Sequence, residues 1–516
     1  MEQYYIQTSS HRRNVLQYLE QSAKREPDKT AVEDEQDSLT YLQLLKQSQQ
    51  IGTALAARSD EHRQPIAVFM EKSAAVLTVF FGIVYSGNFY VTLDSRQPAA
   101  RIRQVLDTLG QPVVITDQKH GKALEKIVQD EQILYLEELS DAEAKAEVLE
   151  RVRGQSTDLD PLYCIFTSGS TGVPKGVLVG HRSVLDFIDE FTETFGFSED
   201  DVFGCQAPFD FDVSVKDIYT AMKTGATLEL IPKQYFSFPT KLLDFLEERQ
   251  VTTLIWAVSA LCIIITLKGF DYKIPKKVNK VLFSGEVMPV GHLTQWQKAL
   301  PDARYVNLYG PTEITCNCTY YKVEREFKPG EHLPIGRPFA NETVMLLDDN
   351  DQMVTEAFKK GELCVAGTAL ALGYYGNPEQ TAKAFVRNPL NTAYPQVIYR
   401  TGDLAFYNAD GDLCFASRKD FQIKHMGHRI ELGEIETAME KCEGVGRACV
   451  IYLEDSSKIG ACYLGGIEVR ALVKELRQQL PAFMIPNLFE KVEEMPLTKN
   501  GKIDRAELRK RLEVLV

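Results

Sequence analysis

The sequence lacks the features of a secreted or nucleic-acid-binding protein. Acidic residues outnumber basic ones by 72 to 58, and the net charge of −14 provides no general cationic field for nucleic acid or an anionic membrane. The first residues, Met1-Glu2-Gln3-Tyr4-Tyr5, lead into a polar segment without the apolar core of a secretion signal. We therefore expect a cytoplasmic protein that binds neither nucleic acid nor a membrane.

Long apolar runs and metal-type cysteine patterns are also missing. The longest apolar run, 254–267, is interrupted by Ser259 and Thr266 and is shorter than the roughly 20 residues that span a bilayer. It predicts a buried strand followed by a helix. The ten cysteines form no spaced pair of Cys-x-x-Cys motifs, so we expect reduced core thiols, with Cys316 and Cys318 among them.

What is present is the composition and periodicity of a large α/β protein. The 516 residues are enough for several cores, and 44% hydrophobic with 25% charged residues is typical of a globular chain. Strand-like runs at 65–70 and 112–116 alternate with amphipathic helical stretches at 73–85 and 101–109. This alternation predicts α/β units with parallel strands.

The pattern changes near Asp420, where a strand at 413–415 is followed by the charged stretch Arg418-Lys419-Asp420. Amphipathic helical patterns follow at 433–442 and 470–480, and the remaining segment is long enough for a small domain. We expect an N-terminal domain over 1–419 and a C-terminal domain over 420–516.

A glycine-rich loop follows an apolar strand at 163–166. This loop, 167–172, reads Thr-Ser-Gly-Ser-Thr-Gly and is followed by Pro174 and Lys175. Small residues let backbone N–H groups approach phosphate oxygens, and Lys175 adds a positive charge. The glycine-to-lysine spacing of a Walker A loop is absent. By itself the loop predicts a phosphate cradle, with a flexible linker as the alternative.

Four further segments follow this loop in order. They are Asn307-Leu308-Tyr309-Gly310-Pro311-Thr312-Glu313, Tyr399-Arg400-Thr401-Gly402-Asp403, Gly427-His428-Arg429-Ile430-Glu431-Leu432-Gly433-Glu434-Ile435-Glu436 and Asn500-Gly501-Lys502-Ile503-Asp504-Arg505. With 167–172 they resemble the adenylate-forming superfamily, which includes acyl-CoA synthetases, luciferases and adenylation domains of nonribosomal peptide synthetases. The resemblance extends from Leu39-Thr40-Tyr41 to the C-terminus.

This resemblance implies an α/β fold of the luciferase and acetyl-CoA synthetase type. A large N-terminal domain would consist of packed α/β sheets with a small distorted barrel, and the C-terminal domain would be a small, mobile α+β lid with its hinge at Asp420. The implied reaction uses ATP and Mg²⁺ to convert a carboxylic acid into its acyl-adenylate, which then passes to a thiol.

The resemblance also implies the residues of the nucleotide site. Those expected to bind ATP are Thr167, Ser168, Gly169, Ser170, Thr171, Gly172, Lys175, Asn307, Tyr309, Gly310, Thr312, Asp403, Arg418 and Lys502. Tyr309 would lie against adenine, and Asp403 with Arg418 would contact the ribose. An ion pair of purely structural importance is the alternative for Asp403 and Arg418.

Three of the matched residues carry the implied chemistry. Thr312 would contact the α-phosphate, and Glu313 offers the hard carboxylate oxygen that Mg²⁺ prefers. Lys502 resembles the mobile catalytic lysine of the superfamily, whose ammonium group stabilises developing negative charge. Catalysis is therefore expected from Thr312, Glu313 and Lys502.

The segment Phe211-Asp212-Val213-Ser214 resembles the motif by which amino-acid-activating members recognise their substrate. The carboxylate of Asp212 can pair with an α-ammonium group, whereas a fatty or aryl acid would leave it buried without a counter-ion. Capping of the following helix by Asp212 is the alternative. By alignment with the family, the rest of the pocket consists of Val213, Lys216, Ile255, Leu282, Ser284, Leu308, Cys316 and Asn317.

Most of these side chains predict a small or modestly polar substrate side chain, because four are aliphatic and two are Ser284 and Cys316. Lys216 is the exception, since an inward-pointing ammonium could pair with an acidic substrate. Lysines usually extend along their stems to solvent, and we expect Lys216 to do so.

The leading hypothesis is an amino-acid adenylating ligase that loads a phosphopantetheinyl carrier protein. No carrier-protein serine motif follows Arg505, so we expect the carrier to act in trans. Met1 favours a free-standing enzyme, with an excised domain as the alternative.

Three other functions remain open. Segment 283–289 also resembles D-alanine:carrier-protein ligases, although Ser284 stands where those usually have cysteine. An acyl- or aryl-CoA ligase is disfavoured by Asp212. A nucleotide-binding scaffold without catalysis is disfavoured by Lys502, Glu313 and Asp403.

Overall fold

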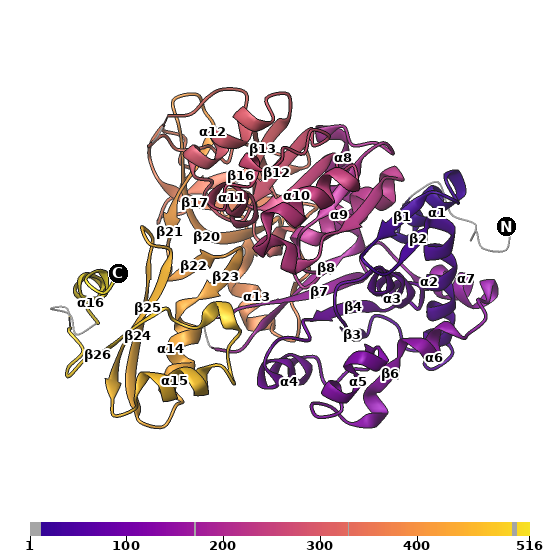
Figure 1. The fold of residues 1–516 in the computed structure, drawn as a ribbon, viewed down its shortest axis with the longest axis horizontal. Helices are drawn as coiled ribbons and strands as arrows, with labels where there is room; N and C mark the ends of the chain where they lie inside the picture. Colours follow the sequence, from indigo (N-terminus) through magenta and orange to yellow (C-terminus); the bar gives the residue numbers. More distant parts are fainter. Residues whose placement is uncertain (1–11, 170–171, 329, 498–502) are drawn as a thin grey trace. The chain divides into compact units, whose positions relative to one another are not determined.

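A computed structural model describes residues 12–169, 172–328, 330–497 and 503–516 (Figure 1). It divides into two compact units of different size. The first comprises Met1–Asp94, Pro112–Ile165 and Val177–Lys419. The second comprises Ser95–Gln111, Phe166–Gly176 and Asp420–Val516.

The larger sheet of the first unit has nine strands in the order β15-β14-β13-β12-β11-β9-β10-β1-β2. They are β1 (Thr30–Glu33), β2 (Ser38–Thr40), β9 (Val202–Cys205), β10 (Thr227–Leu230), β11 (Thr253–Ala257), β12 (Lys280–Ser284), β13 (Arg304–Tyr309), β14 (Thr319–Lys322) and β15 (Arg337–Pro338). The strands from β13 to β1 pair in parallel, whereas β2, β14 and β15 pair antiparallel at the two edges.

A seven-stranded sheet has the order β18-β8-β7-β4-β3-β5-β6. Its strands are β3 (Pro65–Phe69), β4 (Phe89–Leu93), β5 (Val114–Thr116), β6 (Ile133–Tyr135), β7 (Pro161–Thr167), β8 (Lys175–Gly180) and β18 (Gly373–Tyr374). Strands β3 to β7 pair in parallel, which confirms the α/β fold predicted from their alternation with helices. The glycine-rich loop leaves the sheet at the end of β7.

The first unit's helices pack on these sheets or on one another. They are α1 (Leu16–Arg25), α2 (Tyr41–Ala56), α3 (Ala74–Tyr85), α5 (Gln118–Leu124), α6 (Leu136–Ser140), α7 (Ala146–Gln155), α8 (His181–Phe195), α9 (Val213–Thr224), α10 (Pro239–Glu248), α11 (Val258–Thr266), α12 (Val290–Ala299) and α13 (Pro378–Ala384). The expectation that 73–85 is amphipathic was wrong, because every residue of α3 except Ala75 is buried. A helix packed on all sides needs no polar face.

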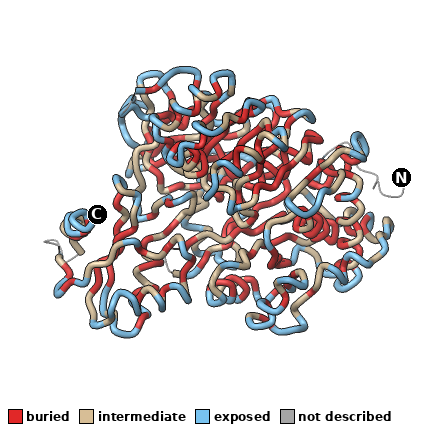
Figure 2. The backbone as a smooth tube through the Cα atoms, viewed as in Figure 1, coloured by how far each residue is buried: buried red, intermediate tan, exposed pale blue. Residues whose placement is uncertain are grey.

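Two hydrophobic clusters lie on opposite faces of the nine-stranded sheet. One combines residues of α2, α3, α8 and α9 with residues of both sheets. The other packs α10, α11 and α12 against the opposite face. The predicted buried strand and helix over 254–267 are confirmed as β11 and α11. Buried residues run through strands and helices alike, and exposed residues are most frequent in the outer loops (Figure 2). Among the described residues, no helix is both long and apolar enough to cross a membrane.

A third sheet of the first unit is antiparallel and forms the half-barrel that corresponds to the predicted small barrel. Its order is β16-β17-β20-β19, with β21 paired to β20. The strands are β16 (Glu342–Leu347), β17 (Gly361–Gly367), β19 (Phe385–Arg387), β20 (Val397–Tyr407) and β21 (Leu413–Arg418). The β20–β21 register places Asp403 directly opposite Arg418.

The second unit is a smaller α+β structure. Its strands are β22 (Gln422–His425), β23 (His428–Glu431), β24 (Val445–Leu453), β25 (Lys458–Gly465) and β26 (Leu488–Lys491). Its helices are α4 (Ala99–Thr108), α14 (Leu432–Glu440), α15 (Val469–Leu476) and α16 (Arg505–Glu513). The helices predicted at 433–442 and 470–480 are confirmed as α14 and α15, and both pack on a core with β24 and β25.

Candidate active site

The segment that follows β13 turns tightly and buries Glu313. A Cβ at Gly310 would lie 2.4 Å from the Cα of Asn317, so only glycine fits this turn. Glu313 is 0% exposed, and its Oε1 accepts a hydrogen bond of 2.8 Å from the hydroxyl of Tyr374. The turn therefore holds a carboxylate in a fixed orientation beside Thr312, which is also buried.

Asp403 lies at the centre of a buried polar cluster in the first unit. Its Oδ1 accepts a hydrogen bond of 2.8 Å from Nη1 of Arg418, and its Oδ2 accepts one from the hydroxyl of Tyr309. Nη1 of Arg418 also donates to the carbonyl of Thr401 at 3.0 Å. The structural ion pair considered for Asp403 and Arg418 is thus present. A carboxylate has about four lone-pair sites, so Asp403 can still accept from ribose hydroxyls.

Asn307, another predicted nucleotide residue, is buried in β13. Its Nδ2 donates a hydrogen bond of 2.8 Å to the carbonyl of Pro334. This bond stabilises the segment that leads to β15, so the amide of Asn307 supports the site's framework.

The glycine-rich loop belongs to the second unit. A Cβ at Gly169 would lie 2.0 Å from the carbonyl oxygen of Val173, and Gly172 has a φ of +79°, so both positions require glycine. The hydroxyl of Ser168 donates to the carbonyl of Arg429 at 2.7 Å. Within the described part of the chain, the buried Oγ1 of Thr167 has no hydrogen-bond partner. An orphaned hydroxyl at the start of this loop fits a phosphate oxygen as its missing partner.

Five predicted site residues need separate mention. Ser170, Thr171 and Lys502 lie outside the described residues. Lys175 is the first residue of β8. Asp420, the predicted hinge, is exposed and accepts a hydrogen bond of 3.2 Å from the backbone N–H of Gln422.

The predicted substrate pocket is brought together on one face of the nine-stranded sheet. Ile255, Leu282 and Val306 lie side by side on β11, β12 and β13. Alternation along the strands puts Ser284 and Leu308 on the same face. The aliphatic members Ile255, Leu282 and Leu308 share one hydrophobic cluster with residues of α9. Strand register therefore explains how residues far apart in sequence come together on one face of the sheet.

Lys216 points into this group, and the expectation that it extends to solvent was wrong. It is 0% exposed, and its Nζ donates hydrogen bonds to Asn317 Oδ1 at 2.7 Å and to Ser284 Oγ at 3.4 Å. Burial lowers the pKa of Lys216, because desolvation disfavours the charged form. Lys216 lies on α9, whose surrounding helices and sheet leave its stem no path to water.

Asp212 occupies the N-cap position of α9 at the edge of the same group. Its side chain does not cap the helix, which removes the alternative considered for this residue. Its backbone carbonyl accepts a hydrogen bond of 3.1 Å from Sγ of Cys316. The negative charge of Asp212 favours the charged form of Lys216 and raises the pKa of Cys316, so both groups lie within its electrostatic reach. Val213 follows at the half-buried start of α9.

The cysteines behave as core thiols, as predicted. All ten are free, and burial raises the pKa of Cys316 and Cys318 well above the usual range for a thiol. Among the described residues, no group of three or more His, Cys, Asp or Glu side chains could hold a metal by itself.

Two residues near these groups escaped the sequence analysis. Tyr374, which orients Glu313, lies 61 positions further along the chain, and no spacing pattern links the two. Asp217 is fully buried, and burial raises its pKa to about 7. Its place next to Lys216 in the sequence was the available signal.

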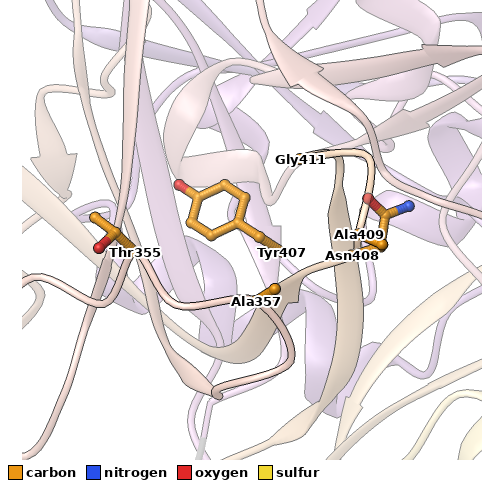
Figure 3. Close-up of a pocket in the computed structure, with 6 residues that line it drawn as sticks. All are labelled: Thr355, Ala357, Tyr407, Asn408, Ala409 and Gly411. Atoms are coloured by element: carbon orange, nitrogen blue, oxygen red, sulfur yellow. The ribbon is translucent and has the colours of Figure 1, made fainter.

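An open surface pocket of the half-barrel region lies apart from these residues (Figure 3). It is lined by Thr355, Ala357, Tyr407, Asn408, Ala409 and Gly411. The lining includes no carboxylate or amine side chain and none of the predicted site residues, so it adds nothing to the candidate active site.

The two-unit α/β fold, the glycine-rich loop after β7 and the buried acid after β13 define an adenylate-forming ligase. Comparison with protein families agrees with this class. The AMP-binding enzyme family matches residues 19–375, and the C-terminal domain of AMP-binding enzymes matches residues 434–502. The chain therefore belongs to the AMP-binding enzyme family.

Individual relatives narrow the likeness to adenylation domains. The chain is 34% identical over 502 residues to zwittermicin A synthase ZmaJ of Bacillus cereus, covering 95% of this chain and 94% of that protein. It is 34% identical to tyrocidine synthase 3 of Brevibacillus parabrevis, over 96% of this chain but 8% of that protein. The structure of holo-PA1221, an NRPS protein containing adenylation and PCP domains bound to a vinylsulfonamide inhibitor, matches with a TM-score of 0.83 and 26% identity. That match covers 97% of this chain and 84% of the other.

Proposed function

We propose that the chain activates an amino acid as its aminoacyl-AMP, with release of pyrophosphate. It then transfers the aminoacyl group to the phosphopantetheine thiol of a carrier protein that acts in trans. The family as a whole performs adenylating ligase chemistry, and the proposal adds an amino acid as the substrate and a carrier protein as the acceptor. The similar structure that contains an adenylation and a PCP domain together supports a carrier as the acceptor.

The observation that carries the amino-acid proposal is the acidic residue Asp212 at the N-cap position of α9, within electrostatic reach of the predicted pocket residues Lys216 and Cys316. A substrate with an α-ammonium group supplies the opposite charge at that position. A fatty or aryl acid supplies none, and it would cover a charged group with apolar surface at considerable cost. The side chain of Asp212 does not cap α9, so helix capping does not account for an acid here.

The residues present fit ATP and Mg²⁺, which enzymes of this family generally use. Thr167 supplies a buried hydroxyl that has no hydrogen-bond partner among the described residues, in a loop whose glycines allow close approach of phosphate. Glu313 supplies one oriented carboxylate, and Mg²⁺ typically takes one or two protein carboxylates together with phosphate and water oxygens. When bound, the metal ion offsets negative charge on the departing pyrophosphate.

The proposed reaction needs no protein nucleophile. A carboxylate oxygen of the amino acid forms a bond to the α-phosphorus of ATP, and the bond from that phosphorus to the pyrophosphate oxygen breaks. Thr312 would contact the α-phosphate, Asp403 with Arg418 would hold the ribose, and Tyr309 would lie against adenine. Lys502 would stabilise the developing negative charge, so the protein contributes mainly orientation and electrostatic stabilisation.

Transfer to the carrier requires a change of the groups that face the substrate. We propose that 420–516 moves as a lid about Asp420 and exchanges Lys502 for a surface that admits the thiol. The last segment of the second unit begins at Asp420, which supports a hinge there. The expected setting is the cytoplasm, with no nucleic acid or membrane as partner.

The proposal is tested by ATP–pyrophosphate exchange across the proteinogenic amino acids, D-alanine, and several aryl and fatty acids. We expect exchange with at least one amino acid and none with acids that lack an amino group. A Lys502→Ala variant should lose about 100-fold or more of the rate. Exchange with fatty or aryl acids alone would refute amino-acid activation, and silence with every acid would support a scaffold.

The acceptor is tested separately by mass spectrometry of a phosphopantetheinylated carrier protein after incubation with the enzyme, ATP and the best amino acid. A mass increase equal to the aminoacyl group is expected on the holo-carrier. The apo-carrier, which lacks the thiol, is the control. No mass increase on several holo-carriers, with coenzyme A acylated instead, would contradict the carrier assignment.

A further inference from the structure

We propose that the amino acid activated here has a carboxylate side chain and that Lys216 is the residue that selects it. This inference rests on the proposed function, because it names the side chain of the amino acid that the same pocket receives. The substrate class is thus an acidic amino acid, with aspartate and glutamate as its common members.

The first support is the direction of the Lys216 side chain. Lys216 starts from α9 and ends between Ser284 of β12 and Asn317, both of which belong to the predicted pocket. It has no exposed surface, whereas lysines in folded proteins almost always keep the ammonium in water. A fully buried lysine inside a substrate pocket requires a reason beyond packing, because a neutral side chain would be cheaper to bury.

The second support is the chemistry of the ammonium's neighbours. An ammonium has three N–H donors, and the described residues provide Nζ with two hydrogen-bond acceptors, Asn317 and Ser284. Both acceptors are neutral. The stronger bond is the one to Asn317, and the 3.4 Å contact with Ser284 is long. The cation is therefore solvated by amide and hydroxyl oxygens but not neutralised by a hydrogen-bonded carboxylate.

Two nearby carboxylates could provide the missing charge, and neither bonds to Lys216. Neither carboxylate oxygen of Asp217 accepts a hydrogen bond from it. Burial raises the pKa of Asp217 to about 7, which reduces its charge, and Lys72 opposes that shift more strongly than Lys216 does. Asp212 lies within electrostatic reach of Lys216, but it is the proposed partner of the substrate's α-ammonium group.

A count of charges then distinguishes the substrates. A bound amino acid brings an α-ammonium group, which Asp212 balances, and an α-carboxylate, which reacts with ATP. With an uncharged side chain, the positive charge of Lys216 stays buried under the substrate without a counter-ion, which is costly. With a carboxylate side chain, the substrate supplies that counter-ion and fills the third donor of Lys216. Discrimination would follow from charge as well as from fit.

The test compares four substrates in ATP–pyrophosphate exchange: aspartate, asparagine, glutamate and glutamine. Each acid and its amide have nearly the same shape, so their comparison isolates the charge. We expect kcat/KM for the preferred acid to exceed that for its amide by about 100-fold, a typical cost of an unpaired buried charge. The aspartate and glutamate arms show which side-chain length fits. Exchange with serine, alanine or an amide in preference to both acids would overturn the inference while leaving amino-acid activation intact.

Two variants attribute the preference to Lys216. Lys216→Met keeps the length of the side chain without its charge, and it should lower kcat/KM for the acid about 100-fold with a smaller effect on the amide. Asn317→Asp retains the lysine but provides an internal carboxylate beside it, and it should also weaken selection of the acid. Unchanged selectivity in both variants would refute the role of Lys216.

Lys223→Met is the matched control, because Lys223 lies on the same helix, is partly buried and pairs with Asp189 at 2.7 Å outside the pocket. Its acid-to-amide ratio should equal that of the unmodified protein. If the unmodified protein shows no exchange with any amino acid, the proposed function itself is refuted. Exchange that favours a neutral amino acid refutes only the acidic substrate.

Discussion

Two buried charged groups of the first unit, Asp403 and Lys216, differ in how their charge is balanced. Asp403 accepts hydrogen bonds from the cation of Arg418 and from Tyr309, so this cluster is neutralised by the protein itself. Lys216 donates to the neutral oxygens of Asn317 and Ser284. The Asp403 cluster is therefore electrically balanced without a ligand. The Lys216 group, in contrast, obtains its counter-charge from the bound amino acid.

The largest expected effect is the loss of stability in Asp403→Ala. This change leaves the half-buried Arg418, whose side chain is 16% exposed, without its carboxylate. Breaking a fully buried ion pair in this way costs about 3–5 kcal/mol, and we expect a loss near the lower end of that range. Urea denaturation measures the free energy of unfolding. Asp349→Ala, which removes a 96% exposed carboxylate from the same half-barrel, is the control and should change stability by about 0.5 kcal/mol or less. Equal effects of the two variants would mean that the ion pair of Asp403 and Arg418 does not stabilise the protein.

Glu313→Gln should lower kcat/KM for pyrophosphate exchange by about 100-fold, because an amide is a poor ligand for Mg²⁺. Its stability should change little, since the amide oxygen can still accept from Tyr374. Exchange measured over a range of Mg²⁺ concentrations tests this prediction, with the exposed Glu331→Gln as control. An unaltered Mg²⁺ dependence would mean that Glu313 is only structural.

Tyr374→Phe is predicted to have a smaller effect. It removes one hydrogen bond to the buried carboxylate of Glu313, which is worth about 1.5 kcal/mol. Thermal or urea unfolding measures this loss, and the exchange rate should fall modestly as Glu313 loses its orientation. Tyr375→Phe is the neighbouring control, because its hydroxyl does not bond to Glu313. If both variants behave alike, Tyr374 does not orient the acid.

Lys216→Met should have the smallest effect on stability. Without ligand, the substitution removes a desolvated cation that has no hydrogen-bonded counter-ion, so the free energy of unfolding should change by less than about 1 kcal/mol or rise. Urea denaturation of the ligand-free protein measures it. A loss of about 3 kcal/mol would mean that Lys216 is already paired within the protein, as Asp403 is, and the comparison would fail.

Local patterns predicted much of the fold. The strand before the glycine-rich loop is β7, the run 254–267 forms β11 and α11, and the helices beyond Asp420 are α14 and α15. These elements follow from periodicity and from glycine positions that only one backbone geometry satisfies. The amphipathic interpretation of 73–85 failed because α3 is covered on almost all sides, which local periodicity does not report.

For the candidate site, the sequence predicted which residues come together better than it predicted the contacts of their side chains. The motif residues follow from their order along the chain, and strand register brings the pocket residues together. The direction of Lys216 was mispredicted because a long stem usually reaches water, and only the surrounding fold removes that path. Tyr374 was missed because its contact with Glu313 depends on how β18 and the turn after β13 meet, which has no local sequence signal.

The central claim is that the side-chain carboxylate of the bound amino acid is the counter-ion of Lys216. Its most direct test is the binding of two stable aminoacyl-adenylate analogues, the aminoacyl-sulfamoyl adenosines of an acidic amino acid and of its amide, measured by isothermal titration calorimetry. The account predicts that the acidic analogue binds about 100-fold more tightly to the unmodified protein and that Lys216→Met removes most of this difference. Equal affinities for the two analogues in the unmodified protein would contradict it.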